Sequence, residues 1–428
     1  MKRLIFLLCI FLAGTVFSEE VLTLEKSIET AISSNLQVTA SSERVRQAEY
    51  GRKEASTYFL PRISSSFTYT RLNEEQAIDF GGMSFKVTDA NLYNFGLTLS
   101  QPLYTGGRLT AAYSQAKENV YRTVFEKQSV EQNLVFDVKK GYFSILKAKR
   151  GVETVNSLKK MAEEHLKTAQ AFFKEGLVTR ADVLKTEVFL ADAEQQILQA
   201  ENGLALSKAG FRFLLNESLS SEFEVEDVLE RRGEKNNLEY WTKLSYERRP
   251  ELKGLESTAK MYGYGVQVER SGYQPQVALF SNYLLDRGTQ NAADEWKDSW
   301  NVGVAVGWDI WNWGETGYRV RKASHQKKEI DAQYALLRKS IELEVKAAYL
   351  NLETADRQIE TARKALEKAE ENVRVTNILY REGMAVTSDV LDAQTDLTAA
   401  RNKYCQSLYD YQLACAQLEK SAGVGGPR

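Results

Sequence analysis

Phe173-Lys174-Glu175-Gly176-Leu177 and Tyr380-Arg381-Glu382-Gly383-Met384 are two versions of one pentapeptide, placed 207 residues apart in the chain. At the same offset, Asp182-Val183-Leu184 matches Asp389-Val390-Leu391 without a gap. Further toward the N-terminus, Pro61 matches Pro275 at an offset of 214. A fixed offset over so long a stretch is the mark of an internal duplication. The change of offset predicts that the two copies differ in the length of one loop between Pro61 and Leu103.

Each copy predicts, in order, a helix, two strands, a long helix, a tight turn and a second helix. Residues 108–173 contain no proline, so one helix can run through them, with breaks or bends expected at Gly141 or Gly151. Apolar residues recur there every three or four positions, which is the narrow stripe of a coiled coil that needs lateral neighbours. The stripe consists of Val155, Leu158, Ala162, Leu166, Ala169 and Phe173.

The two pentapeptides predict where the long helices end. Lys174 and Arg381 place a cation in the last turn, where the helix dipole favours it, and Gly176 and Gly383 supply the left-handed position that follows. Each copy therefore predicts a long helical hairpin with a short tip.

The next helices begin soon after these glycines. Thr179 is a suitable N-cap, with Asp182 three residues on as the capping-box partner. In the second copy we expect Thr387 or Ser388 to be the cap.

Four short segments alternate between apolar and small or polar residues: 63–69, 93–99, a weaker one near Val277, and 300–310. A period of two over ~10 residues is typical of outer-membrane strands, although a half-buried sheet in a soluble domain alternates in the same way. The expected interfacial aromatic belt consists of Tyr69, Tyr93, Tyr283, Trp300 and Trp308.

Four strands are too few to close, because the working minimum for a barrel is ~8. An open sheet would leave unsatisfied edges in lipid. If these strands enter a membrane, the chain must therefore form an oligomer, and three copies would supply twelve strands.

The N-terminus predicts export. Lys2 and Arg3 precede an apolar run, and Val16-Phe17-Ser18 supplies small residues before Glu19, which together describe a secretory signal peptide over residues 1–18. The layout that follows is repeat 1 over 19–215, a charged segment over 216–246 that is an equatorial belt or a linker, repeat 2 over 247–422, and a short tail over 423–428.

Composition excludes several classes of function. The 56 Lys and Arg nearly balance the 58 Asp and Glu, unlike the basic excess of a nucleic-acid binder. Two His and three Cys leave little for a metal site or a His-based catalytic site, so we expect no cofactor, no metal and no enzyme activity. His165 and His325 lie in charged helical contexts and are expected to be solvated. Cys405 and Cys415 are ~15 Å apart on one helix, too far for a disulfide.

The sequence resembles the TolC-like outer-membrane efflux protein family over essentially the whole mature chain. The resemblance lies in Gln101-Pro102-Leu103-Tyr104-Thr105-Gly106-Gly107-Arg108 and in the paired tips Glu175-Gly176-Leu177-Val178 and Glu382-Gly383-Met384-Ala385, each followed by Asp-Val-Leu. It implies an α+β membrane protein in the outer membrane, extending into the periplasm: a homotrimer with a twelve-stranded transmembrane β-barrel and a long coiled-coil α-helical barrel. The implied partners are outer-membrane lipid, a periplasmic adaptor (membrane fusion) protein and an inner-membrane pump or ABC transporter, with no nucleic acid. The implied function is a passive exit duct for tripartite efflux or type I secretion.

The resemblance also implies two functional zones. The tips Gly176-Leu177 and Gly383-Met384 correspond to the positions where family members meet adaptor hairpins, although C-capping alone also explains the glycines. Asp389 and Asp392 correspond to acidic rings at the periplasmic entrance, and Asp396 continues the same helix face. Asp182 and Asp396 are candidates too, but a helix N-terminus favours Asp182 without any pore. Some members carry a latching Arg near the second tip. Met384-Ala385-Val386-Thr387 has none, and Arg180 of the first tip is the available substitute.

Two other classes of function remain open at this point. A secreted periplasmic adaptor or coiled-coil spacer would explain the hairpins but not four strands with aromatic ends. A cell-wall hydrolase would need a compact catalytic region, and the only segment outside the repeats is short and charged.

Overall fold

The computed structural model describes residues 21–219, 222–228, 236–289 and 295–425. The expected signal peptide, 1–18, lies outside this range, as does the run 229–235 of the charged segment. The chain divides into two compact units. The first consists of Met1–Val38, Glu131–Ser245 and Glu344–Arg428, and the second of Thr39–Val130 and Tyr246–Leu343.

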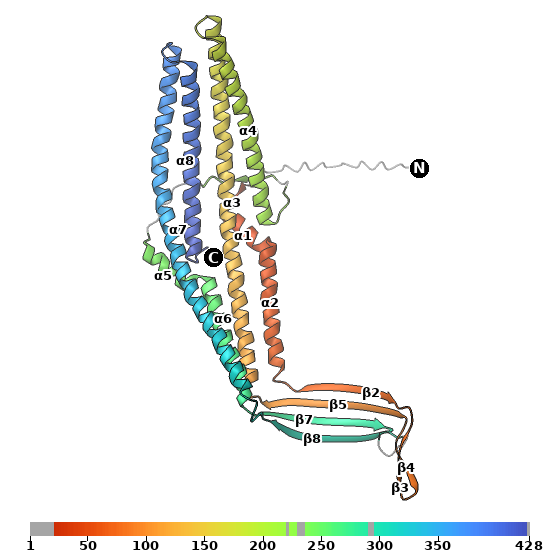
Figure 1. The fold of residues 1–428 in the computed structure, drawn as a ribbon. Helices are drawn as coiled ribbons and strands as arrows, with labels where there is room; N and C mark the ends of the chain where they lie inside the picture. Colours follow the sequence, from red (N-terminus) through yellow and green to blue (C-terminus); the bar gives the residue numbers. More distant parts are fainter. Residues whose placement is uncertain (1–20, 220–221, 229–235, 290–294, 426–428) are drawn as a thin grey trace, which may run out of the picture. The chain divides into compact units, whose positions relative to one another are not determined.

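The same series of elements occurs twice (Figure 1). In the first copy, α2 (Leu36–Thr57) leads to strands β2 (Arg62–Arg71) and β5 (Asn91–Tyr104), then to α3 (Arg108–Lys174) and α4 (Arg180–Leu215). In the second, α6 (Pro250–Arg270) leads to β7 (Gln276–Arg287) and β8 (Lys297–Gly307), then to α7 (Glu315–Arg381) and α8 (Thr387–Ser421). Helices α3 and α7 each contain 67 residues. The remaining elements are α1 (Leu24–Ser34), α5 (Leu238–Arg248), the short 3-10 helix η1 (Ser271–Tyr273) and strands β1, β3, β4 and β6.

Helix α3 continues through Gly141 and Gly151, so a helix break at either glycine was a wrong expectation. Gly141 has a packing role instead. A Cβ built on it would lie 3.0 Å from a ring carbon of Phe211 in α4, so glycine lets this aromatic ring approach the α3 backbone.

The hairpin tips have the predicted ends. Gly176 and Gly383 have φ of +75° and +73°, and the amides of Leu177 and Met384 donate back to the carbonyls of Phe172 and Leu379 at 2.9 and 2.8 Å. This left-handed turn satisfies carbonyls that would otherwise lack partners at each helix end.

The starts of the next helices are only partly as expected. Thr179 caps α4, and its hydroxyl accepts from the Asp182 amide in a complete capping box. The expectation of Thr387 or Ser388 as the cap of α8 was wrong, because Thr387 is already the first helical residue and Val386 is the cap. The carboxylate of Asp389 accepts from the Val386 amide at 3.0 Å, which makes a hydroxyl cap unnecessary.

The coiled-coil stripe of α3 follows the predicted one except at two positions. Val155, Leu158, Ala162 and Ala169 are buried as expected. His165 is also buried, with 5% of its surface exposed, so the expectation that it is solvated was wrong. Spacings of four, three and four from Leu158 lead through Ala162 and His165 to Ala169, so His165 occupies a position of the stripe. Leu166 is half-buried beside it, and Phe173 is exposed.

The second unit contains a four-stranded antiparallel sheet in the order β2-β5-β7-β8. All four predicted strands are present, although β8 ends at Gly307, three residues before the predicted Ile310. The connection between β2 and β5 contains a separate hairpin, β3 (Gln76–Phe80) with β4 (Met83–Thr88). This hairpin lies between Pro61 and Leu103, where the sequence placed the difference between the copies.

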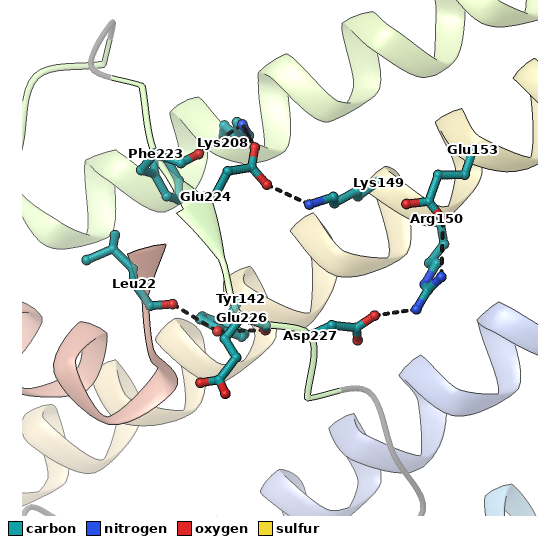
Figure 2. A network of polar contacts seen from close by, with 10 residues as sticks. All are labelled: Leu22, Tyr142, Lys149, Arg150, Glu153, Lys208, Phe223, Glu224, Glu226 and Asp227. Carbon is teal, nitrogen blue, oxygen red and sulfur yellow. Dashed lines mark hydrogen bonds and ion pairs between the residues drawn. The ribbon is translucent and has the colours of Figure 1, made fainter. Parts of the chain in front are cut away.

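A small clasp in the first unit had no signal in the sequence. Strand β1 (Val21–Leu22) pairs in parallel with β6 (Glu224–Val225), and the Tyr142 hydroxyl of α3 is within hydrogen-bond distance of two carbonyls, 3.0 Å from that of Leu22 and 2.9 Å from that of Glu226 (Figure 2). Burial raises the pKa of Tyr142 to about 12, so the hydroxyl keeps its proton.

Ion pairs surround this clasp (Figure 2). Glu224 accepts from Lys149 of α3 at 2.6 Å and from Lys208 of α4 at 3.0 Å, and Asp227 pairs with Arg150. The hydrogen bond from Lys149 lowers the pKa of Glu224. The described part of the charged segment is therefore tied to both helices of the first hairpin.

Among the described residues, no helix combines the length and the apolar character needed to cross a membrane. Cys405 and Cys415 are both half-buried and form no disulfide with each other, as their separation along one helix predicts.

Candidate functional site

The register of the four-stranded sheet gives it two different faces. Phe67 lies opposite Phe95, Leu97 opposite Tyr283, and Tyr283 opposite Trp300. Because directly opposed residues of antiparallel strands share a face, the four predicted apolar rows meet on one side. This face comprises Ile63, Phe67, Tyr69, Tyr93, Phe95, Leu97, Leu99, Val277, Leu279, Tyr283, Leu285, Trp300, Val302, Val304 and Val306, with Ser65, Gln101, Ser281, Arg287 and Asp298 as polar members.

The other face carries small and polar side chains. Serines and threonines of β2 and β5 lie there, together with Asn282, Asn301 and Gly303. Phe280, Leu284 and Leu92 are its large apolar members. The Phe280 ring lies directly over Gly303, where a built Cβ would come within 2.7 Å. The sheet is thus amphipathic, like a strand surface with lipid on one side and water on the other.

The apolar face is not covered by the described residues over β8. Trp300, Val302, Val304 and Val306 are each more than half exposed. A contiguous apolar surface of this kind marks an interaction with another protein or with lipid.

Aromatic residues lie at both ends of this face. At the end away from the helices, the Tyr69 ring centroid is 5.0 Å from that of Tyr93, which is 6.1 Å from that of Trp296. At the helix end, Trp308 is 57% exposed, and its indole N–H donates to the Tyr273 carbonyl at 3.2 Å. Trp300 and Trp308 are eight positions apart, about 26 Å along the strand at ~3.3 Å per residue. For a strand tilted by ~40°, this corresponds to a height of about 20 Å, slightly less than the ~25 Å apolar band of outer-membrane barrels.

Trp311 and Trp313 extend this group at the helix end, and they were not among the aromatic residues predicted for the belt. They are 75% and 85% exposed, with ring centroids 5.8 Å apart. Trp313 has φ of +53°, in the left-handed region that non-glycine residues seldom adopt. Its repeat counterpart Gly106 has φ of +60°. The second copy therefore has tryptophan where the first copy has glycine, the residue that adopts such a φ without strain. Strain of this kind is typical of functional positions.

The tips present apolar side chains to solvent. Leu177 and Met384 are both 69% exposed, and nothing lies within 4 Å of a Cβ built on Gly176 or Gly383. The backbone at each tip is therefore open to close approach by a partner.

Asp389, Asp392 and Asp396 are all exposed on α8. They form an exposed stripe beside its buried face, which holds Val390, Ala393 and Leu397. Asp389 has a second role as the carboxylate that caps α8, the counterpart of Asp182 in α4. Hydrogen bonds from the Thr179 hydroxyl and amide lower the pKa of Asp182.

Arg180, the proposed substitute for a latching arginine, is the exposed first residue of α4. It forms no ion pair among the described residues.

Comparison with known proteins identifies the class. A family model described as "Outer membrane efflux protein" matches residues 27–217 and 241–424. The alkaline protease secretion protein AprF of Pseudomonas aeruginosa is 24% identical over 397 residues, covering 89% of this chain and 80% of AprF. The outer membrane protein TolC of Vibrio cholerae is 21% identical over 411 residues, covering 91% of this chain and 87% of TolC. Among solved structures, the CmeC outer membrane channel of Campylobacter jejuni superimposes with a TM-score of 0.81 at 18% identity, covering 94% of this chain and 86% of that chain.

The chain therefore belongs to the outer membrane efflux protein family, and it is an outer membrane protein with the TolC-like fold. Membership decides between the function classes that the sequence left open, in favour of the exit duct over the secreted coiled-coil adaptor. The relatives are named as channel, efflux and secretion proteins, not as enzymes.

Proposed function

We propose that this protein is a homotrimeric exit duct, in which three sheets close into one twelve-stranded barrel in the outer membrane. The observation that carries the proposal is the sheet itself. It has an exposed apolar face, and its outer strands β2 and β8 each have one unpaired edge. Lipid does not tolerate unpaired strand edges, so β8 of one protomer pairs with β2 of the next and outer-membrane lipid covers the apolar face.

The small and polar face then lines the lumen. Its serines, threonines and asparagines favour water, which suits a conduit. An inner-membrane pump or ABC transporter supplies the energy. A periplasmic adaptor (membrane fusion) protein docks on the tips at Gly176-Leu177 and Gly383-Met384.

Asp389 and Asp392 form the periplasmic entrance of this duct. In a trimer each exposed carboxylate becomes a ring of three like charges, which favours cations over anions. Asp182 is assigned to capping rather than to the ring, and Asp396 is a further member of the acidic face.

The first test is the mass of the mature protein extracted in detergent from the outer-membrane fraction, measured by light scattering. A trimer is the expected result. A water-soluble monomer released without detergent would overturn the proposal.

The entrance is tested by the ion selectivity of single channels in a planar bilayer. Asp392→Asn is expected to reduce cation selectivity, whereas Asp392→Glu keeps the charge and serves as the matched control. Equal selectivity in both variants would remove Asp392 from the entrance.

The docking tips are tested by export in cells. Leu177→Asp with Met384→Asp places charge on both exposed apolar contacts and is expected to abolish export while the trimer still assembles. Leu177→Met with Met384→Leu keeps the apolar surface and is expected to retain export. Loss of export in both pairs of variants would show that the tips require these side chains for another reason.

A further inference from the structure

The β3–β4 hairpin is the clearest feature that the exit-duct proposal leaves without a role. Its strands are joined by Gly81-Gly82, with φ of +63° and +84°, the paired positive values of a two-residue type I′ turn. Among the described residues, which leave out 290–294 of the second copy, it occurs only in the first copy of the repeat, and each protomer contributes this one hairpin.

The register places four large apolar side chains on one face of this hairpin. Ile78 lies opposite Phe85, and Phe80 lies opposite Met83. All four are exposed, by 61%, 54%, 79% and 68% respectively. The other face carries Ala77 opposite Lys86 and Asp79 opposite Ser84. The hairpin is thus amphipathic, and its apolar face has no cover within the described residues.

The root of the hairpin is fixed to the end of the four-stranded sheet. The Asp89 amide donates to the Gly288 carbonyl at 2.8 Å, at the end of β7. Lys86 forms ion pairs with Glu75 and Asp89. The hairpin is therefore an ordered extension of the strand end that carries Tyr69 and Tyr93.

Neither lipid nor water is a suitable cover for the apolar face. The hairpin has only two strands, so β3 and β4 each have one unpaired edge, and hydrocarbon does not accept such edges. Exposure of four adjacent large apolar side chains to water is equally unfavourable. We therefore expect protein to cover the apolar face. The protein that is present at a fixed ratio in every trimer is the same hairpin of the other two protomers.

The dimensions allow the copies to meet. Twelve strands spaced ~4.8 Å apart and tilted by ~40° have a circumference of about 75 Å and a radius of about 12 Å. The five residues of β3 span about 17 Å at ~3.4 Å per residue. A hairpin rooted at the rim can therefore reach the axis of the barrel.

We propose that the apolar faces of three β3–β4 hairpins, at Ile78, Phe80, Met83 and Phe85, pack together on the trimer axis and close the outer mouth of the duct. This inference rests on the proposed trimer. It gives the channel a hydrophobic closure where the four-stranded sheets end, and passing cargo must part the three hairpins.

The test is oxidative crosslinking in intact outer membranes. Met83→Cys puts a thiol on the apolar face beside the turn, where the three copies approach most closely. Mild oxidant is expected to give a covalent dimer, with the third copy left single, and to lower single-channel conductance until a reductant restores it. Ser84→Cys is the matched control, because it places the thiol one residue on, on the opposite face, and is expected to give no dimer.

The outcomes separate the closure from the duct. The mass of the same protein is measured by light scattering in detergent, and a monomeric mass would overturn the proposed function itself. A trimer in which Met83→Cys gives no dimer, and reacts freely with a water-soluble maleimide, would overturn the closure alone. Equal dimer yields from Met83→Cys and Ser84→Cys would also overturn it, because random collision rather than a shared apolar face would explain them. Phe80→Ser is expected to raise conductance without oxidant, and unchanged conductance would contradict the closure.

Discussion

The imidazole ring of His165 in α3 lies 4.8 Å, centroid to centroid, from the ring of Tyr380 in α7. Phe172 stacks on the same tyrosine at 5.5 Å, and the Tyr380 hydroxyl is 3.4 Å from that of Thr387 in α8. His165 Nε2 is buried with no hydrogen-bond partner among the described residues. One aromatic cluster therefore joins the first helical hairpin to the second, with an unpaired ionisable group at its centre.

This cluster predicts an acid-sensitive contact between the hairpins. Burial lowers the pKa of His165 from 6.5 to about 4, and no charged neighbour contributes. Between pH 6.5 and 4 the folded state therefore binds fewer protons than the unfolded state. The stabilisation that comes from burying the neutral His165 ring is complete above pH ~6.5 and is lost as the pH falls toward 4. The full loss is on the order of 3 kcal/mol. Unfolding midpoints at pH 7.5 and 4.5 check this, and His165→Phe is expected to flatten the difference.

His325 provides the control for this prediction, since it is an exposed histidine on α7. His325→Phe makes the same substitution outside the aromatic cluster and therefore serves as the matched control for His165→Phe. If the unfolding midpoints of the unaltered protein and of His165→Phe changed with pH in parallel, protonation of His165 would cost no stability, and the prediction would be wrong.

Two of the candidate entrance aspartates, Asp182 and Asp389, also cap a helix, so we expect their loss to lower the stability of that helix. Asp182 and Asp389 each accept from the backbone amide three residues earlier, both at 3.0 Å. Replacing either with Ala is expected to cost about 0.5–2 kcal/mol, as for other helix caps. Asp392→Ala and Asp396→Ala lie beyond the first turn and are expected to be neutral. Hydrogen exchange of the first turns of α4 and α8 measures the effect, and equal protection in all four variants would contradict it.

The adjacent glycines at the start of α3, Gly106 and Gly107, differ in how much space they leave for an added side chain. Both have positive φ, +60° at Gly106 and +83° at Gly107. A Cβ on Gly106 would lie 2.6 Å from the Gln274 Cβ and 2.9 Å from the Ser271 carbonyl, whereas a Cβ on Gly107 meets nothing. Gly107→Ala is expected to cost about 1–2 kcal/mol from backbone strain alone, and Gly106→Ala clearly more. The yield of folded protein in the outer membrane and its thermal midpoint show which variant is less stable. A greater loss for Gly107→Ala than for Gly106→Ala would contradict the close approach of Gln274 and Ser271 to Gly106.

Much of the fold could be predicted because its signals are long or repeated. The glycine tips, the alternating strands and the proline-free helices each appear twice, and the registers of β5 with β2 and β7 bring the predicted apolar rows together. The features that were missed depend on contacts distant in sequence. Strands β1 and β6 have two residues each, too few for any periodicity. His165 was misjudged because its neighbours in sequence are charged, whereas its neighbours in space are aromatic. Trp313 took the place of a glycine, and only the backbone angle reveals the substitution.

The clasp at Tyr142 gives the last prediction. Its hydroxyl is fully buried and lies within hydrogen-bond distance of two carbonyls, those of Leu22 in β1 and Glu226 after β6. Tyr142→Phe keeps the ring, which packs edge-on against Phe143 and Phe211, but removes the hydroxyl donor from the Glu226 carbonyl. The Leu22 carbonyl still accepts from the Glu226 amide at 3.4 Å, so one carbonyl loses its donor, at a cost of about 1–3 kcal/mol. The expected result is faster proteolysis near residues 21–25 and 222–228, while the hairpin tips remain equally resistant. Lys149→Met is the control for the surrounding ion pairs, and it is expected to have a smaller effect because that pair is half exposed and Lys208 still holds Glu224. Equal proteolysis of Tyr142→Phe and the unaltered protein would show that strand pairing, and not the hydroxyl, holds the clasp.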